Sequence, residues 1–403
     1  MTVLRTLFVT RRYWPHLGDD SSAWLYALAD GLQRKGAAPE IVTPRYAASW
    51  PKNLRVCDVP IHRPLPAPRS EWSMGRYVRS LTQWLAEHAP EFDLIFADSL
   101  HEEAKAAVDA ARRCGIPSVL RFGGSEGLSD AGWWQQNRLR KQYRQACRAA
   151  DCLVAPRAFA EQELISIGCP RQRIVRIANG FPTAAISTAT QRQQARKSLA
   201  SANSDLHVAA DDLVLVTTNR LQPESGIMDL VTALRRLQDE CPRLQVWMLN
   251  DGELRESIFS HICSEGLQAM VKLPGTFCPI DDLIAAADLY VLPRDTEGLN
   301  YFLPRFVAAG VPAAVANTAE SRTLMGAAMS HVAAFLPHSP EEIVNAVMSI
   351  VNDLPTAREN ARRARQLVLT HSFNDTVNAY LRVFLRLTGR SDSSSSNNYE
   401  PAS

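Results

Sequence analysis

Short runs of apolar residues alternate along the chain with segments whose apolar positions recur at helical spacing. Residues 213–217 (LVLVT) are apolar on both faces, whereas residues 21–34 place Leu25, Leu28 and Leu32 on one side of a helix. This alternation is typical of β-α-β units that build a parallel sheet covered by helices on both faces. We therefore predict an α/β protein.

The predicted strands form two series. They lie at residues 7–10, 40–43, 93–97, 118–122, 152–155 and 174–177 in the first series, and at 213–217, 244–249, 271–273, 289–292 and 313–315 in the second. Between the series, Asn179-Gly180-Phe181-Pro182 is turn-forming sequence, and the following residues up to about 210 have little apolar periodicity. We interpret this stretch as the connection between two Rossmann-like domains.

The length of 403 residues and the composition, 46% hydrophobic and 21% charged, fit a folded protein of two domains. The predicted organisation is an N-terminal domain at residues 1–185, a second domain at 186–370, a C-terminal helix at 371–390 that packs back on the first domain, and a disordered, Ser- and Asn-rich tail at 391–403.

Charge and hydropathy limit the partners. A formal net charge of +2 argues against nucleic acid, and no apolar run approaches the length that spans a bilayer. The first residues read as a strand instead of a signal peptide, so we expect a cytoplasmic protein. Arg140, Arg144 and Arg148 form a cationic helix stripe that could contact anionic lipid at a membrane surface; the alternative is a solvated helix face.

The residues that most clearly suggest a ligand site follow the predicted strand at 289–292. A turn at Glu297-Gly298 precedes the start of a helix, so the backbone N–H groups of Leu299 and Asn300 are expected to be free. Such a junction at the carboxyl edge of a parallel sheet suits a phosphate group. A plain strand-to-helix turn is the alternative. Arg11, after the first strand, could likewise meet a phosphate or carboxylate, or be a surface charge.

The segment from Pro293 to Pro312 resembles the signature of family 4 glycosyltransferases with the GT-B fold, P-S-x-x-E-G-x-G-x-x-x-L-E-A-x-A-x-G-x-P. Further similarities place Gly18-Asp19 in the first glycine loop, Asn179-Gly180 in the P-N-G turn, residues 219–226 in G-R-L-x-x-x-K-G, residues 250–255 in G-x-G-x-x-x and residues 273–276 in the loop of the base pocket. The resemblance implies two Rossmann-like domains whose parallel sheets face each other across a cleft.

The resemblance also implies a reaction: transfer of a sugar, with retention, from a nucleotide-sugar donor to a glycan, a lipid-linked molecule or a small molecule. No metal or other cofactor is expected. Arg220 would neutralise the diphosphate, on which negative charge grows as the sugar leaves. Glu297, with the amides of Gly298, Leu299 and Asn300, would hold the donor sugar and phosphate, and Thr276 would lie beside the base.

Four positions depart from the family pattern. Arg305 stands where the second glutamate would grip the ribose, and Ser225 stands where a lysine would meet the diphosphate. Asp19 replaces the second glycine of the first loop, after Gly18, and Asp98 replaces a histidine that touches the donor sugar.

Two hypotheses follow from these departures. In the first, the enzyme is active: Arg305 reaches the diphosphate and restores the charge lost at Ser225, while Asp98 or His101 holds sugar hydroxyls. In the second, the chain is a degenerate GT-B scaffold that transfers no sugar and serves as a binding or regulatory partner. Binding of UDP or GDP separates the two.

Overall fold

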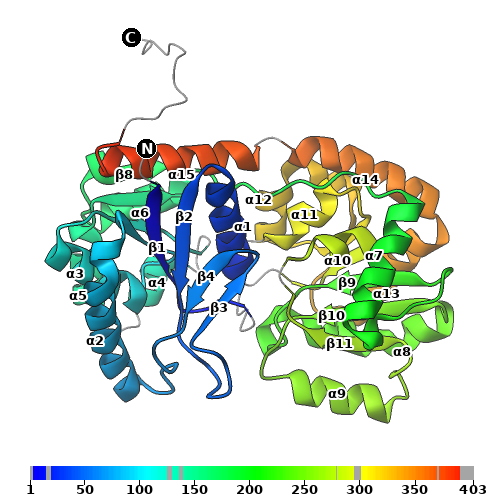
Figure 1. Ribbon diagram of the computed structural model, residues 1–403. Coiled ribbons are helices and arrows are strands. Elements are labelled where there is room, and N and C mark those ends of the chain that lie inside the picture. Colours follow the sequence, from blue (N-terminus) through cyan, green and yellow to red (C-terminus); the bar gives the residue numbers. More distant parts are fainter. Residues whose placement is uncertain are drawn as a thin grey trace, which may run out of the picture. The chain divides into compact units, whose positions relative to one another are not determined.

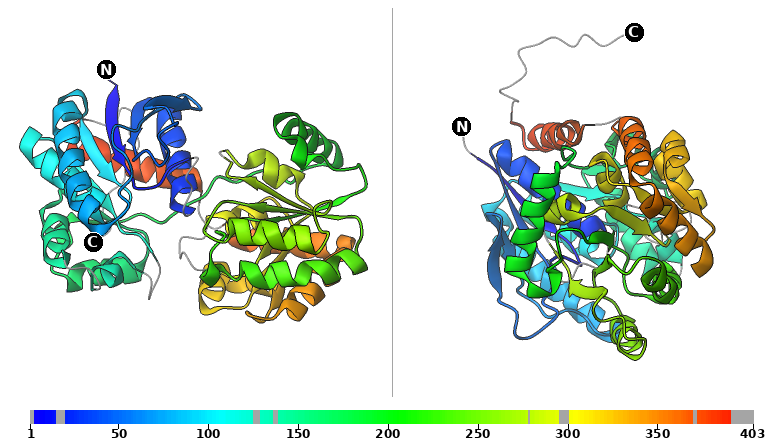
Figure 2. Two further views of the ribbon diagram at one scale, coloured as in Figure 1. Left: turned by 90° about the horizontal axis from the view of Figure 1, so that it is seen from below. Right: turned by 90° about the vertical axis from the view of Figure 1, so that its right-hand side faces the viewer.

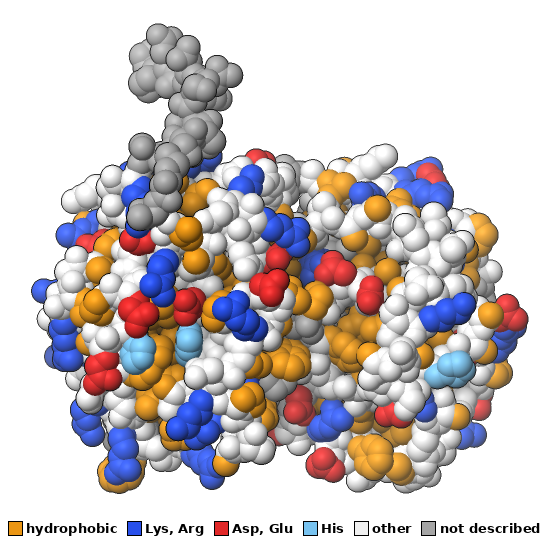
Figure 3. Space-filling view, viewed as in Figure 1, with side chains coloured by type: hydrophobic (Ala, Val, Ile, Leu, Met, Phe, Trp, Pro, Cys, Tyr) orange, Lys and Arg blue, Asp and Glu red, His pale blue; other side chains and the backbone are white. Residues whose placement is uncertain are grey.

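A computed structural model describes residues 3–14, 20–124, 129–135, 139–277, 279–294, 301–369 and 372–390 (Figure 1). The chain separates into two compact units. The first comprises residues 1–11, 25–180 and 373–403, and the second residues 12–24 and 181–372. Over the face drawn in Figure 3, acidic and basic side chains are intermixed, in keeping with a formal net charge of +2.

The first unit is built on a sheet of strand order β3-β4-β2-β1-β5-β6-β7-β8, in which β3 is antiparallel to β4 and the other neighbours pair in parallel. Its strands are β1 (Leu4–Val9), β2 (Ala37–Val42), β3 (Asn53–Val56), β4 (Val59–His62), β5 (Leu94–Ala97), β6 (Ser118–Arg121), β7 (Cys152–Ala155) and β8 (Ile174–Arg176). The helices of this unit are α1 (Asp20–Arg34), from Leu25 onward, α2 (Glu71–His88), α3 (Glu102–Cys114), α4 (Asp130–Gln135), α5 (Arg140–Ala149), α6 (Ala158–Ser166) and α15 (Phe373–Leu387).

Helix α15 closes the first unit although it lies at the other end of the chain. Its Phe384 ring packs 6.3 Å from the ring of Phe8 on β1 and 6.1 Å from that of Phe96 on β5. Val377 lies so close to α1 that a Cβ on Gly31 would be 2.6 Å from one of its methyl carbons. Aromatic burial of this kind stabilises the unit, and glycine at position 31 permits the helices to approach.

The second unit contains a parallel sheet of order β11-β10-β9-β12-β13-β14, with helices on both faces (Figure 2). Its strands are β9 (Leu213–Thr217), β10 (Leu244–Leu249), β11 (Val271–Gly275), β12 (Leu289–Leu292), β13 (Ala313–Ala316) and β14 (Ala333–Phe335). Its helices are α7 (Ala189–Ala202), α8 (Ile227–Glu240), α9 (Arg255–Ser264), α10 (Asp281–Ala286), α11 (Phe302–Ala308), α12 (Ala319–Met325), α13 (Pro340–Asn352) and α14 (Leu354–Val368).

Every strand predicted from the sequence is present within a few residues, but the prediction missed β3, β4 and β14. The stretch after the Asn179-Gly180 turn, interpreted as the connection between the domains, contains a regular helix, α7, that was not predicted. The buried face of α7 consists of Ala195, Arg196 and Leu199. Because a charged residue takes the central buried position, the apolar spacing that marks a helix is interrupted.

Candidate functional site

The carboxyl edge of the second sheet is formed by loops that follow β9, β10 and β11. The N–H of Asn250 donates to the carbonyl of Gly275 at 2.9 Å, which ties the loop after β10 to the end of β11. The N–H of Leu221 donates to the carbonyl of Asp251 at 3.2 Å. Since neighbouring parallel strands end at the same edge, these loops form one continuous surface, the usual place for ligands in such sheets.

The approach of two of these loops depends on a glycine. A Cβ on Gly252 would lie 2.2 Å from the carbonyl oxygen of Leu221, in the loop after β9. That carbonyl accepts a hydrogen bond from the N–H of Leu254 at 2.8 Å. Any larger residue at position 252 must therefore displace the loop that carries Arg220.

Asn219, which is buried, fixes the backbone beside Arg220. Its side-chain amide donates to the carbonyls of Ser225 at 3.2 Å and Arg294 at 2.6 Å. The second bond joins the loop after β9 to the residues after β12, so Arg220 and Arg294 lie at the same edge of the sheet. Nη1 of Arg294 also lies 3.3 Å from Nε2 of His338.

Ser225 is fully buried in the turn before α8. Its hydroxyl donates to the carbonyl of Gln222 at 2.7 Å and accepts from the N–H of Ile227 at 3.3 Å. Gly226 follows with φ of 68°, and a Cβ there would lie 3.1 Å from the Cβ of Arg294. The structure therefore gives Ser225 a role in shaping the turn, with its hydroxyl occupied by backbone.

Arg305, on α11, is only 5% exposed. Its Nη2 lies 2.7 Å from Oδ1 of Asp281 on α10, and its guanidinium carbon is 5.1 Å from the centre of the Tyr301 ring. In this arrangement the charge of Arg305 is neutralised by Asp281. Thr276, predicted beside the base, follows β11 at the carboxyl edge and is half-buried.

The other predicted donor-binding residues lie outside the described residues. They are Gly18, Asp19, Glu297, Gly298, Leu299 and Asn300. Arg294, the last described residue before Glu297 and Gly298, was not singled out from the sequence. The sequence did contain a signal, because Arg294 stands where the family signature has a serine and lies two residues after the end of β12.

In the first unit, Asp98 and Arg121 form a buried ion pair where β5 and β6 end. Nε of Arg121 donates to Oδ1 of Asn179 at 3.3 Å. Burial works against the charged form of Arg121, but Asp98 outweighs it and raises the pKa of that guanidinium. Asp98 thus orients Arg121 and, through it, the Asn179-Gly180 turn.

Asp130 holds together the loops after β5 and β6. Its Oδ2 accepts from the N–H of Leu100 at 2.8 Å and from that of Gly123 at 2.7 Å, and its Oδ1 lies 3.0 Å from Nε2 of His101. The His101 ring centre is 4.1 Å from that of Trp133. Burial alone would lower the pKa of His101, but the Asp130 carboxylate more than offsets it and raises that pKa.

Arg11 is a member of an ion-pair cluster with the first turn of α3. Its guanidinium lies 3.2 Å from Oε2 of Glu102 and also pairs with Glu103. Although burial opposes the charge, Glu103 and then Glu102 raise the pKa of Arg11. Of the two alternatives offered by the sequence, a ligand anion or a surface charge, the structure shows neither: the partners of Arg11 are two carboxylates of the protein itself.

Two arginines of the predicted cationic stripe on α5 have structural partners. Nε of Arg144 and Nε of Arg148 donate to the carbonyl of Ile167 at 2.7 and 2.9 Å. That carbonyl ends α6, so both side chains cap a helix C-terminus. Arg140, the first residue of the stripe, is exposed.

Among the described residues, His, Cys, Asp and Glu side chains nowhere gather in a group of three or more that could hold a metal ion. None of the described helices is both long and apolar enough to cross a membrane.

Comparison with known families decides the classification. Residues 22–180 match the model of the glycosyl transferase 4-like domain, and residues 212–353 match that of the glycosyl transferases group 1. The chain belongs to the family 4 glycosyltransferases. The two matches cover most of the chain and correspond to its two parallel sheets, which agrees with the predicted GT-B fold.

Among curated relatives of this glycosyltransferase is LpsE of Rhizobium meliloti, a lipopolysaccharide core biosynthesis glycosyltransferase. It is 24% identical over 165 residues, which make up 41% of this chain and 44% of LpsE. The chain therefore matches less than half the length of that relative.

Solved structures resemble the glycosyltransferase over almost its whole length. HepE of Anabaena in complex with UDP shares 17% identity at a TM-score of 0.60, covering 95% of this chain and all of HepE. Sucrose-phosphate synthase of Thermosynechococcus elongatus shares 14% identity at a TM-score of 0.69, covering 96% of this chain and 99% of that one. At these identities the similarity establishes the fold.

Proposed function

We propose that the protein transfers a sugar from a nucleotide-sugar donor to an acceptor, and that the donor diphosphate binds at the carboxyl edge of the second sheet. The observation that carries the proposal is the position of Arg220 in the loop after β9, which Asn219 joins to Arg294 in the segment after β12. HepE, a structural neighbour, has been solved in complex with UDP and with UDP-glucose, which supports a nucleotide-sugar donor.

The chemistry requires positive charge near the leaving group. When the bond between sugar and phosphate breaks, negative charge grows on the diphosphate, and a fixed cation lowers the barrier. Arg220 supplies that charge in the proposal. For the second cation we assign Arg294 in preference to Arg305, because Arg305 is buried against Asp281 whereas Arg294 shares the edge with Arg220. The residues at Glu297 to Asn300 complete the donor site in this proposal.

Retention of configuration and independence of metal also belong to the proposal. Both follow from the family resemblance, and two arginines would provide the charge that a divalent cation supplies in other transferases. The proposed acceptor is a glycan or a lipid-linked molecule, a class that the name of LpsE supports. Peripheral contact with an anionic membrane surface would involve Arg140, with Arg144 and Arg148 of the same stripe.

The test is a thermal-shift screen of UDP-, GDP- and ADP-sugars with the purified protein, each in the presence of EDTA and of Mg²⁺. A donor that binds the native state raises Tm by mass action. We expect one nucleotide class to raise Tm equally under both conditions and to release its nucleoside diphosphate when acceptor is added. No shift with any donor would favour the degenerate scaffold instead.

A further inference from the structure

A pocket lies at the amino edge of the second sheet, the edge opposite to that of Arg220. Its walls come from the start of α7, the junction of α10 with β12, the junction of α11 with β13, and α14. Asp288 directly precedes β12 and Pro312 directly precedes β13, and both line the pocket. The cavity measures about 170 Å³. It therefore belongs to a different part of the unit from the proposed donor site.

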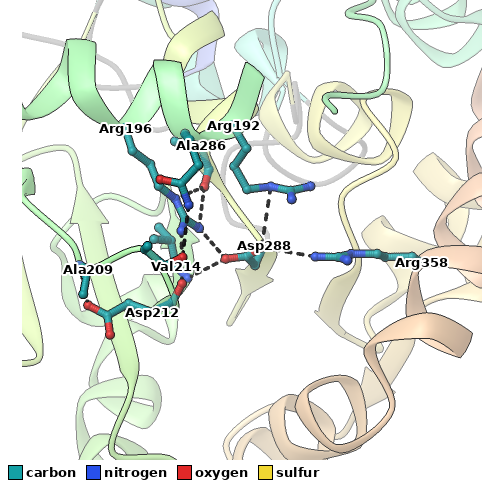
Figure 4. Close-up of polar contacts among 10 residues, drawn as sticks. Arg192, Arg196, Ala209, Asp212, Val214, Ala286, Asp288 and Arg358 are labelled. Atoms are coloured by element: carbon teal, nitrogen blue, oxygen red, sulfur yellow. Dashed lines mark hydrogen bonds and ion pairs between the residues drawn. The ribbon is translucent and has the colours of Figure 1, made fainter. Parts of the chain in front are cut away.

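Three arginines, Arg192, Arg196 and Arg358, contact the carboxylate of Asp288, and a fourth, Arg362, lines the same pocket (Figure 4). Helix α7 provides Arg192 and Arg196, one turn apart, and α14 provides Arg358 and Arg362, also one turn apart. Arg192, Arg358 and Arg362 line the pocket together with Asp288. Figure 4 shows Arg192 and Arg358 extending toward Asp288 from separate helices.

The charge of Asp288 is already balanced by Arg196, which is almost completely buried. Nη2 of Arg196 pairs with Oδ2 of Asp288, and that oxygen also accepts from the N–H of Val214 at 3.0 Å. The remaining donors of Arg196 reach the carbonyls of Ala286 and Asp212, each at 3.1 Å. Arg196 and Asp288 thus form a complete, neutral structural pair.

The positive charges of Arg192 and Arg358 are not needed to balance Asp288, which Arg196 already neutralises. Their contacts with Oδ1 of Asp288 measure 3.5 and 3.4 Å, longer than the roughly 2.7–2.9 Å of a good charge-assisted hydrogen bond. The buried Nε of Arg192 makes no hydrogen bond to the described residues. Burial, and then the charges of Arg358 and Arg196, lower the pKa of Arg192 despite the opposing effect of Asp288. The pocket is therefore a site of uncompensated positive charge.

Two further features favour an anion. Within the described part of the chain, Arg362 pairs with Glu359, at 3.4 Å between exposed side chains, and such pairs are weak. Ser187 and Ala189 line the pocket at the start of α7, a helix of 14 residues whose N-terminal N–H groups and dipole attract negative charge.

We propose that this pocket binds a phosphate group, held between Arg192 and Arg358. The cavity, at about 170 Å³, has room for a phosphate group. The group could belong to inorganic phosphate or to a phosphorylated sugar. Either ligand would bind independently of the donor, because the donor site lies at the other edge of the sheet.

The test uses the full chain in phosphate-free buffer, with KCl holding the ionic strength constant. Inorganic phosphate and glucose 6-phosphate are titrated separately by calorimetry, and Tm is measured in parallel. We expect binding by the wild type, and affinity at least about tenfold weaker in the double variant Arg192→Gln/Arg358→Gln, since two charged donors are lost. Tighter binding of glucose 6-phosphate than of phosphate would identify a sugar phosphate as the ligand; equal affinity would identify phosphate itself.

The controls separate this pocket from the donor site. Arg235→Gln/Arg236→Gln removes two exposed arginines of α8 and should leave phosphate binding unchanged. Arg220→Gln and saturating UDP should also leave it unchanged, so the test holds even if the protein has no transferase activity.

Without phosphate, the Tm of the double variant should equal or exceed that of the wild type, because two like charges are removed. Phosphate binding that UDP displaces, or that the double variant retains, would overturn the proposal.

Discussion

Arg121 and Asp98 form an ion pair in the interior of the first unit, with side chains 1% and 0% exposed. The pair joins the ends of β5 and β6, and Arg121 extends the connection to Asn179. Gly180, the next residue, donates from its N–H to the hydroxyl of Thr376 on α15 at 3.1 Å. A charged pair therefore helps to hold the C-terminal helix on the first sheet.

The substitution Asp98→Asn should destabilise the first unit strongly. It leaves Arg121 buried without a counter-charge, which typically costs about 3–5 kcal/mol. Urea unfolding measures the change in the free energy of unfolding. Asp109→Asn is the matched control: its partner Lys105 and Asp109 itself are partly exposed, so the expected loss is below about 1 kcal/mol. An Asp98→Asn variant of normal stability that loses transfer activity would instead identify Asp98 as a substrate contact.

Arg305→Gln should change UDP affinity by less than about twofold, because the guanidinium is committed to Asp281. Arg305→Glu should lower Tm, since it buries a carboxylate beside Asp281. Calorimetry with UDP and a thermal scan measure the two effects. A tenfold loss of UDP affinity in a folded Arg305→Gln variant would show that Arg305 reaches the diphosphate after all.

Two glycine substitutions should change the stability of the protein in opposite directions. Gly252→Ala places a Cβ against the carbonyl oxygen of Leu221, so it should lower stability by more than about 2 kcal/mol and weaken UDP binding. Gly75→Ala, in α2, meets no atom within 4 Å and should raise stability by about 0.5–1 kcal/mol. Chemical unfolding compares both with the wild type. Equal stability of the two variants would contradict the described packing of the loops.

The His101–Asp130 pair predicts a dependence of stability on pH. In the folded state the pKa of His101 is raised above its ordinary value of 6.5. The pair with Asp130 therefore contributes fully to the free energy of unfolding below pH 6.5, and this contribution is lost as the pH rises through the raised pKa. The pKa of Asp130 is lowered, so this carboxylate stays ionised throughout that range. The urea midpoint should be higher at pH 6 than at pH 9, and His101→Gln should reduce that difference. An unchanged difference in the variant would assign the effect to other groups.

The fold was largely predictable because its strands are short, apolar and buried on both faces, as β5, β6 and β7 illustrate. Strand β3 was missed because its residues alternate between exposed and half-buried positions and carry little apolar signal. Helix α7 was missed for a different reason: its buried Arg196 is balanced by Asp288, which lies 92 residues later in the chain.

The candidate site was predictable where a motif carries the residue, as at Arg220. The role of a residue in the site was less predictable where its side chain could bind either the ligand or another residue of the protein. The sequence offers Arg305 as a cation for the diphosphate, and only the tertiary structure shows that Asp281 of α10 neutralises it. The pocket at Asp288 has no motif at all, because its arginines come from helices about 160 residues apart, and their convergence is a property of the tertiary structure.

The most direct test of the account is the affinity for UDP of Arg220→Gln, measured by calorimetry beside the wild type and the surface variant Arg235→Gln. We predict that Arg220→Gln weakens UDP binding by at least about tenfold, because a charged donor to the diphosphate is lost. Arg235→Gln should bind as the wild type does. Equal UDP affinity in all three proteins would contradict the assignment of the donor site to the carboxyl edge of the second sheet.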